Sequence, residues 1–197
     1  MKTFIHLIFL SSLFASSIAA DTTKTVDKAS GLSVWTLNDN GLELTLKQAF
    51  PEQIRAFYLA RGFPKATAEK IAKSCMFQTI VKNSLQKGDP IHMDQTLWQV
   101  KTNKQTRGIK LKSIWDKEWK NNKQIKHSAR LAYRWATFPT KQTFEPKGDY
   151  NWGMTCFDLQ PGTKFAVEVV WKLGDTQKSA WVDDLSCAQD SNTKENE

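Results

Sequence analysis

The residues that offer the most distinctive chemistry are sulfur and imidazole ligands in two parts of the chain. Met154 and Cys156 are separated by one residue on a predicted strand, so their side chains point to the same face. His92 and Met93 form a second, adjacent pair. Thiolate and thioether ligands select copper(I), so these four residues predict a copper site. The alternative is that Met154 and Cys156 are ordinary core residues and that His92 lies in a loop.

Tryptophans offer a second kind of chemistry, the stacking of sugar rings on exposed indoles. The chain contains eight tryptophans, and Trp35, Trp98 and Trp152 occur where the alternation of apolar and polar residues does not clearly bury them. Asp149 and Asn151, beside Trp152, would supply polar partners. These residues are compatible with a carbohydrate-binding module. The alternative is a tryptophan-rich core in which each indole N–H is hydrogen-bonded.

Catalytic motifs are absent from the sequence. His92 and His127 are the only histidines after residue 20, and neither has a nucleophile or an acid at a motif spacing. There is no CxxC, HxH or HExxH zinc motif, no G-x-S-x-G and no glycine-rich phosphate loop. Two of the carboxylates Glu145, Asp149 and Asp158 could form the acid pair of a glycosidase, but separation along the chain does not give the distance between carboxylates that such an enzyme requires. We therefore predict a protein that is not an enzyme and that needs no cofactor other than the possible copper.

Positive charge is concentrated in one segment. The chain has a formal net charge of +8, and the stretch from Lys101 to Arg130 contains ten Lys or Arg but only Asp116 and Glu118 as acids. We expect this segment to dock an acidic protein or an anionic surface of the cell envelope. The alternative is a solvated helix face that serves solubility. The expected contact residues are the lysines Lys110, Lys112, Lys117, Lys120, Lys123 and Lys126.

The first twenty residues have the pattern of a signal peptide. Lys2 precedes an apolar run from Thr3 to Ile18, and two alanines follow. The run is short and serine-rich for a membrane span, so we expect cleavage near Asp21 and no transmembrane segment afterwards. The mature protein is then periplasmic or secreted, and either compartment disfavours nucleic acid as a partner.

Three cysteines in an exported protein predict one disulfide and one free thiol. A bond from Cys187 to either Cys75 or Cys156 would tie down the C-terminal end of the domain. We favour Cys75–Cys187, because closing the longer loop removes more entropy from the unfolded chain. Cys156 is then the free cysteine.

Alternating residues predict the strands that position these groups. The stretch from Gly148 to Cys187 contains three strands with short turns, which predicts an antiparallel meander. Residues 32–36 and 42–46 also alternate, and the Asn40-Gly41 turn between them predicts a hairpin. Residues 129–138 alternate as well and are interpreted as a strand, with a helix as the alternative.

Helical spacing predicts three helices. Pro51–Arg61 and Pro64–Ser74 form a helical hairpin, and residues 111–120 form a basic amphipathic helix. We therefore predict one mainly β domain, on the border of α+β, at residues 21–188. It is an antiparallel, Ig-like β-sandwich of roughly seven strands with the helical hairpin as an insertion. The likeness to Ig-like domains is one of architecture alone and assigns no function. Residues 21–30 are polar and are expected to be loose, as chain termini usually are. Residues 189–197 are predicted to be a disordered tail.

Overall fold

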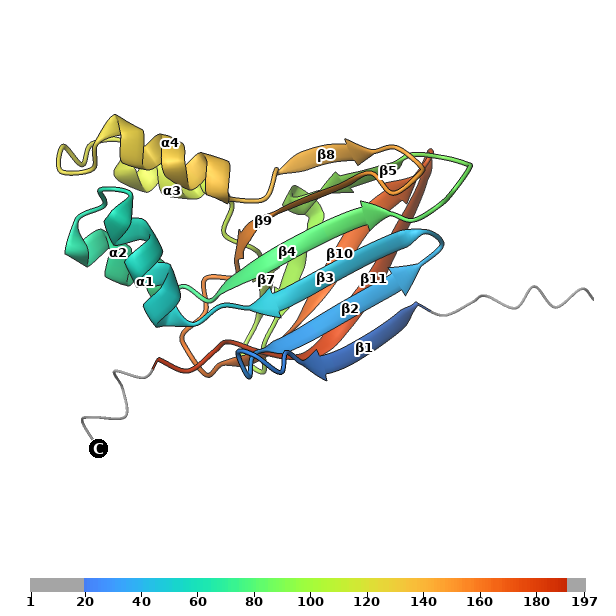
Figure 1. Ribbon diagram of the computed structural model, residues 1–197, viewed down its shortest axis with the longest axis horizontal. Coiled ribbons are helices and arrows are strands. Elements are labelled where there is room, and N and C mark those ends of the chain that lie inside the picture. The colour runs from blue at the N-terminus through green and yellow to red at the C-terminus, as the bar shows by residue number, and fades with distance from the viewer. Residues whose placement is uncertain (1–19, 191–197) are drawn as a thin grey trace, which may run out of the picture.

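The computed structural model describes residues 20–190, which form a sandwich of two antiparallel β-sheets with helices at one end (Figure 1). The first sheet has the strand order β1-β2-β3-β4-β9. The second has the order β7-β6-β10-β5-β8, and β11 pairs with β10. The predicted mainly β sandwich is confirmed at this level. The predicted signal peptide, apart from residue 20, and residues 191–197 of the predicted tail lie outside the described residues.

The elements have the following bounds. The first sheet contains β1 (Asp21–Val26), β2 (Ser33–Asp39), β3 (Leu42–Gln48), β4 (Met76–Asn83) and β9 (Tyr150–Cys156). The second contains β5 (Ile91–Asp94), β6 (Gln99–Lys101), β7 (Thr106–Gly108), β8 (Lys141–Phe144), β10 (Lys164–Leu173) and β11 (Thr176–Ser186). The α-helices are α1 (Pro51–Ala60), α2 (Lys65–Ala72), α3 (Lys112–Trp119) and α4 (His127–Ala136).

The hairpin of β2 and β3 is confirmed. Asn40 and Gly41 both have positive φ, 45° and 89°, which suits a two-residue turn between twisted strands. The register pairs Asp39 with Leu42 directly across this turn. Every second residue of β3 from Leu42 onward is buried, so one face of the hairpin is turned toward the second sheet.

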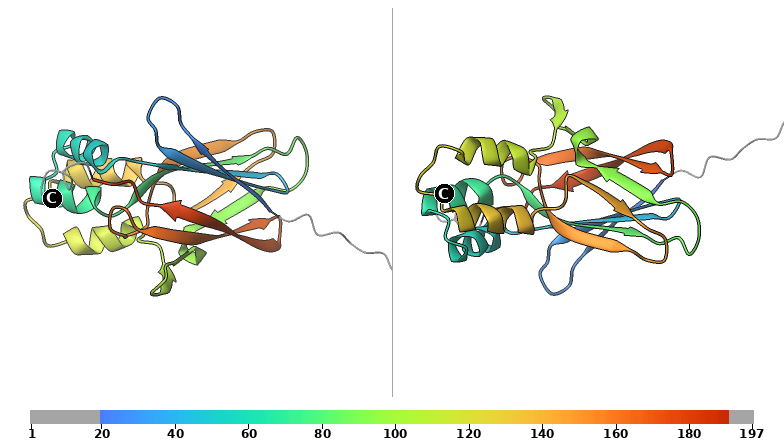
Figure 2. Two further views of the ribbon diagram at one scale, coloured as in Figure 1. Left: turned by 90° about the horizontal axis from the view of Figure 1, so that it is seen from below. Right: turned by 90° about the horizontal axis from the view of Figure 1, so that it is seen from above.

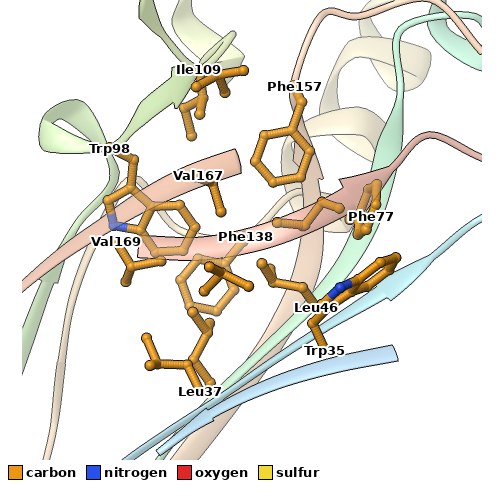
Figure 3. Close-up of a cluster of buried hydrophobic side chains, with 14 of the residues drawn as sticks. Trp35, Leu37, Leu46, Phe77, Trp98, Ile109, Phe138, Phe157, Val167 and Val169 are labelled. Carbon is orange, nitrogen blue, oxygen red and sulfur yellow. The ribbon is translucent and has the colours of Figure 1, made fainter. Parts of the chain in front are cut away.

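The main core lies between the two sheets (Figure 3). Leu37 and Leu46 of the first sheet face Val167 and Val169 of the second. Trp98 fills the space beside them, and its indole N–H donates to the carbonyl of Val170 at 3.3 Å. Burial of these side chains provides the apolar contact that holds the sheets together.

The disulfide Cys75–Cys187 is confirmed. Cys75 directly precedes β4 of the first sheet and Cys187 directly follows β11 of the second, so the bond joins the two layers covalently. Cys156 is the free cysteine, and it is buried.

Two predictions about strands are wrong. Residues 21–26 were expected to be loose, but they pair with β2 along their whole length, from Asp21↔Asn38 to Val26↔Ser33. Their side chains are all exposed, so backbone hydrogen bonds hold a strand that has no apolar pattern. The meander is also wrong, because β9 pairs with β4 in the first sheet and only β10 and β11 are neighbours. The described residues contain eleven strands rather than roughly seven.

The strand predicted at residues 129–138 is wrong, and α4 occupies this segment. Leu131, Tyr133 and Trp135 imitate the period of a strand, but the buried positions are Ala129 and Tyr133, four residues apart. The small residue Ala129 lies on the buried face of the helix, whereas the large residues Leu131 and Trp135 are exposed, Trp135 at 87%. The strand was predicted from the spacing of the large side chains, whereas burial follows the helical spacing of Ala129 and Tyr133.

The four α-helices gather at one end of the sandwich, where α1 and α2 follow β3 while α3 and α4 follow β7 (Figures 1 and 2). They share a second cluster of buried side chains. Tyr133 lies among its aromatic rings, with ring centroids 4.8 Å from Trp119, 5.4 Å from Tyr58 and 6.0 Å from Trp115. Aromatic packing thus fixes α4 against the other helices.

Gly153 permits a close approach between β9 and the end of α4. The backbone N–H of Phe138 donates to the carbonyl of Met154 at 2.9 Å. A Cβ at Gly153 would overlap the nitrogen of Phe138 and lie 2.8 Å from the carbonyl carbon of Thr137. We expect Gly153→Ala to lower the free energy of unfolding by about 1–3 kcal/mol, as overpacking does. Urea unfolding followed by circular dichroism measures this change.

The matched control for this substitution is Gly108→Ala. Gly108 is also a strand glycine, but a Cβ there meets only the carbonyl oxygen of Trp98, at 3.9 Å. The control variant should unfold close to the wild-type midpoint. Equal stability of the two variants would contradict the close-approach explanation.

Arg55 of α1 joins the helices to the C-terminal end of the described chain. Its guanidinium pairs with the carboxylate of Glu69 in α2 and, at 2.8 Å, with that of Asp190. Asp190 is 2% exposed, so the packed part of the chain reaches beyond the predicted boundary at residue 188. The hydrogen bond from Arg55 lowers the pKa of Glu69 from 4.5 to about 2.

This pKa shift predicts a pH dependence of stability. The folded-state pKa of Glu69 is lower than the unfolded value, so its contribution is complete above about pH 4.5 and is lost as the pH falls toward about 2. We expect Glu69→Gln to lose less unfolding free energy than the wild type over this pH range. Denaturant titrations at both ends of the range measure the difference. Parallel losses in both proteins would contradict the assignment.

Candidate binding surfaces

Four exposed lysines mark the α3–α4 hairpin, which comprises α3, α4 and the loop between them. Lys117 lies near the end of α3, and Lys120, Lys123 and Lys126 follow in or beside the loop. The loop lies at the helical end of the molecule (Figure 1). None of the four forms an ion pair within residues 20–190. Their charge is therefore available to a partner.

Lys110 has a different role from the other predicted contact residues. Its side chain is 8% exposed, its Nζ lies 2.6 Å from Oε1 of Glu118, and it lies 3.8 Å from the ring centroid of Trp115. Burial would raise the pKa of Glu118, but hydrogen bonds from Lys110 and Lys70 outweigh it and lower that pKa. Lys110 thus stabilises the packing of α3. Of the six lysines predicted to contact a partner, it is therefore the one whose side chain is buried inside the protein. Lys112 is half-buried.

The four residues of the copper hypothesis are not brought together. Cys156 belongs to the buried cluster under the helices, and Met154 packs against that cluster. Met93 lies instead in the core between the sheets, and the adjacent His92 lines a hollow on the second sheet. The imidazole Nδ1 of His92 contacts the hydroxyl of Thr143 at 2.8 Å. One ion cannot contact all four side chains in this arrangement.

Cys156 itself is held as a neutral thiol. Its Sγ lies 3.3 Å from the carbonyl oxygen of Ser74, to which it donates. Burial raises the pKa of the thiol to about 11, so it stays protonated at neutral pH. Copper ligation requires the thiolate, which this site disfavours. Within residues 20–190 no three His, Cys, Asp or Glu side chains are grouped as metal ligands.

The exposed tryptophans differ from those expected. Trp35 and Trp98 are buried at 1% and 0% exposure, which removes them from any sugar platform. Trp152 is exposed at 57%, as expected from its position. Trp135 is the most exposed tryptophan of the described residues, and sequence reasoning missed it because the segment was interpreted as a strand.

The polar neighbours of Trp152 already have partners. The amide nitrogen of Asn151 donates to the side-chain oxygen of Gln142 at 2.7 Å, and the carboxylate of Asp149 accepts from the backbone of Glu145 at 2.9 Å. These two side chains therefore already form hydrogen bonds within the protein and are not arranged to bind a sugar. Trp152 and Trp135 also line a hollow together with Lys112.

A larger groove lies between α1, α4 and the face of the first sheet that is turned away from the second sheet. We call it the α1–α4 groove. Its volume is about 580 Å³, within the range of ligand pockets. The register of the first sheet places Lys47, Gln78 and Met154 in one row across its floor. Its lining residues are Ser30, Leu32, Lys47, Gln48, Ala49, Gln53, Ile54, Phe57, Arg61, Gln78, Ala132, Trp135, Ala136, Trp152 and Met154.

The fold and these surfaces define a two-sheet antiparallel sandwich with a basic helical end and an apolar groove. No protein-family model, no curated protein and no solved structure matches this chain. Among residues 20–190, no helix has the length and apolar character needed to cross a membrane.

Proposed function

We propose that this chain is an exported, non-enzymatic binding or assembly protein that docks an acidic partner or an anionic surface through the α3–α4 hairpin. The observation that carries the proposal is the set of four exposed, unpaired lysines, Lys117, Lys120, Lys123 and Lys126. The signal-like first twenty residues and the disulfide support export to an oxidising compartment. We also propose that the sandwich is Ig-like and that the helical hairpin of α1 and α2 is an insertion in it.

The hairpin presents its charges from a fixed platform. Trp115 and Trp119 of α3 and Tyr133 of α4 are buried in the aromatic cluster, so the loop with its lysines connects two helices that are packed in place. Each lysine near an anionic surface contributes about 1 kcal/mol of attraction. Such exposed charges are screened over about 8 Å at physiological ionic strength, so docking depends steeply on salt.

The test uses two probes, vesicles of phosphatidylglycerol for an anionic surface and poly-L-glutamate for an acidic protein. The variant changes all four lysines to glutamine. We expect the wild type to bind at least one probe, with affinity that falls as salt is added. The variant should bind at least about tenfold more weakly, because it loses several contributions of about 1 kcal/mol each.

The control variant changes four exposed lysines elsewhere to glutamine, Lys87, Lys104, Lys164 and Lys172. It has the same net charge as the test variant and leaves the hairpin intact. We expect it to bind like the wild type. An equal loss in both variants, or binding that is insensitive to salt, would remove the hairpin as the docking site.

A further inference from the structure

The α1–α4 groove is a second feature of the molecule, separate from the four lysines of the docking proposal. Its lining residues come from different parts of the chain. Ile54 and Phe57 come from α1, Ala132 and Ala136 from α4, and Met154 from β9. Because these elements are fixed by the sheet register and by the helical cluster, the groove is formed before any ligand arrives.

The exposed tryptophans make the groove apolar at its open side. Trp135 and Trp152 both line it, with exposures of 87% and 57%. Large apolar side chains grouped on a surface mark sites of interaction. Together with Ile54, Phe57 and Met154 they supply apolar contacts for an apolar ligand.

The charged residues of the lining are all positive. Among residues 20–190, Lys47 and Arg61 are the only ionisable side chains that line the groove, and no Asp or Glu of this range is among its lining residues. The Nζ of Lys47 is 2.8 Å from the carboxylate of Asp27, so its charge is partly compensated. Arg61 has no carboxylate partner within residues 20–190.

Arg61 is held at the groove by its own helix. Its guanidinium carbon lies 3.2 Å from the ring centroid of Phe57, and Nη1 donates to the carbonyl of Phe57 at 3.0 Å. These contacts engage one side of the guanidinium and leave further N–H donors for a ligand. A guanidinium pairs with a carboxylate through two parallel hydrogen bonds. The groove therefore combines apolar walls with one unpaired cation.

This combination discriminates between ligand classes. A sugar needs many polar partners, but the walls are mostly apolar, and Gln48 already donates to Ser186 and accepts from Ser33. A quaternary ammonium ligand requires aromatic rings without a competing cation, and Arg61 already occupies the face of Phe57. An apolar body with an anionic group matches both the walls and the charge.

We propose that the α1–α4 groove binds a single-chain amphiphile with a carboxylate head, whose chain lies between Trp135, Trp152 and Phe57 and whose head pairs with Arg61. This ligand site is independent of docking through the four lysines, so either proposal can fail without the other.

The first test compares two probes with the same chain and opposite head charge, dodecanoate and dodecyltrimethylammonium. Both are titrated calorimetrically into the full mature protein below their aggregation concentrations. We expect dodecanoate to bind at one site and more tightly than the cation. Arg61→Gln should weaken dodecanoate binding by about tenfold, the effect of one lost charge-assisted pair, and Arg61→Lys should restore part of it.

The second test addresses the apolar walls. Ala136→Trp fills the groove from α4 without removing a core side chain, and Trp135→Ala removes an exposed one. Both should weaken dodecanoate binding, while circular dichroism shows an unchanged fold. The control is Trp181→Ala, which removes a partly exposed tryptophan of β11 on the other sheet and should leave binding intact.

Three results would overturn the proposal. They are the absence of dodecanoate binding to the wild type, equal affinity for the two head groups, and equal loss of binding in the Trp135→Ala and Trp181→Ala variants. The quadruple lysine variant keeps the groove and should bind dodecanoate like the wild type. Loss of dodecanoate binding in that variant would place the site at the four lysines instead of in the groove.

Discussion

Replacement of both Cys75 and Cys187 by serine is expected to lower the free energy of unfolding by about 4 kcal/mol. The two residues are 112 positions apart, so the bond closes a long loop in the unfolded chain and removes much of its entropy. In the folded state the same bond joins the two sheets. A domain of this size is stable by only about 5–15 kcal/mol, so the loss is a large part of the total. Guanidinium unfolding of both proteins under non-reducing conditions measures it.

The control is Cys156→Ala, which removes the buried free thiol and leaves the disulfide. It deletes one weak hydrogen bond to Ser74 and a small volume, so a cost near 1 kcal/mol is expected. Reduction of the wild type should reproduce the loss seen in the double serine variant. If the double serine variant were as stable as Cys156→Ala, the covalent bond would not contribute the expected free energy of unfolding.

The features that sequence patterns predicted correctly are those with a strong local signal. The alternation of Phe165, Val167 and Val169 identifies β10, because one face of that strand is buried and the other is not. The Asn40-Gly41 turn identifies the hairpin, because few residue pairs tolerate two positive φ values. The disulfide followed from counting cysteines and comparing loop lengths.

The features that were missed depend on contacts distant in sequence. β1 has six exposed side chains, so only its backbone pairing with β2 reveals it. β9 pairs with β4 of the first sheet, and Gly153 lets the chain after α4 approach β9 closely; no sequence periodicity indicates either contact. In α4 the large exposed residues Leu131 and Trp135 outweighed the small buried Ala129.

The same distinction applies to the binding surfaces. The charge of the basic segment is visible from composition, but which lysines are exposed is a tertiary property, and Lys110 turned out to be buried against Trp115. The groove could not be predicted, because its lining comes from stretches that are far apart in the sequence and its most exposed tryptophan, Trp135, was placed on a strand. Composition predicted a charged surface, whereas only the fold reveals the cavity.

Replacement of Tyr133 by alanine is expected to lower the free energy of unfolding by about 3–5 kcal/mol, the range for large aromatic core residues. Tyr133 is 1% exposed, and its ring contacts Trp119, Trp115 and Tyr58 from the other helices. Its loss leaves a cavity where α3 and α4 meet α1. Urea unfolding measures the cost, and dodecanoate titration reports on Trp135, which α4 also carries.

The companion variant Tyr133→Phe separates the ring from the hydroxyl. Burial raises the pKa of Tyr133 well above its usual value, and the hydroxyl has no hydrogen-bond partner within residues 20–190. Removing an unpaired buried hydroxyl costs nothing, so Tyr133→Phe should be at least as stable as the wild type. It should also keep the α1–α4 groove, because the ring still fixes α4. If both variants were equally destabilised, the hydroxyl rather than the ring would hold the helices, and the aromatic cluster would not be what positions the groove.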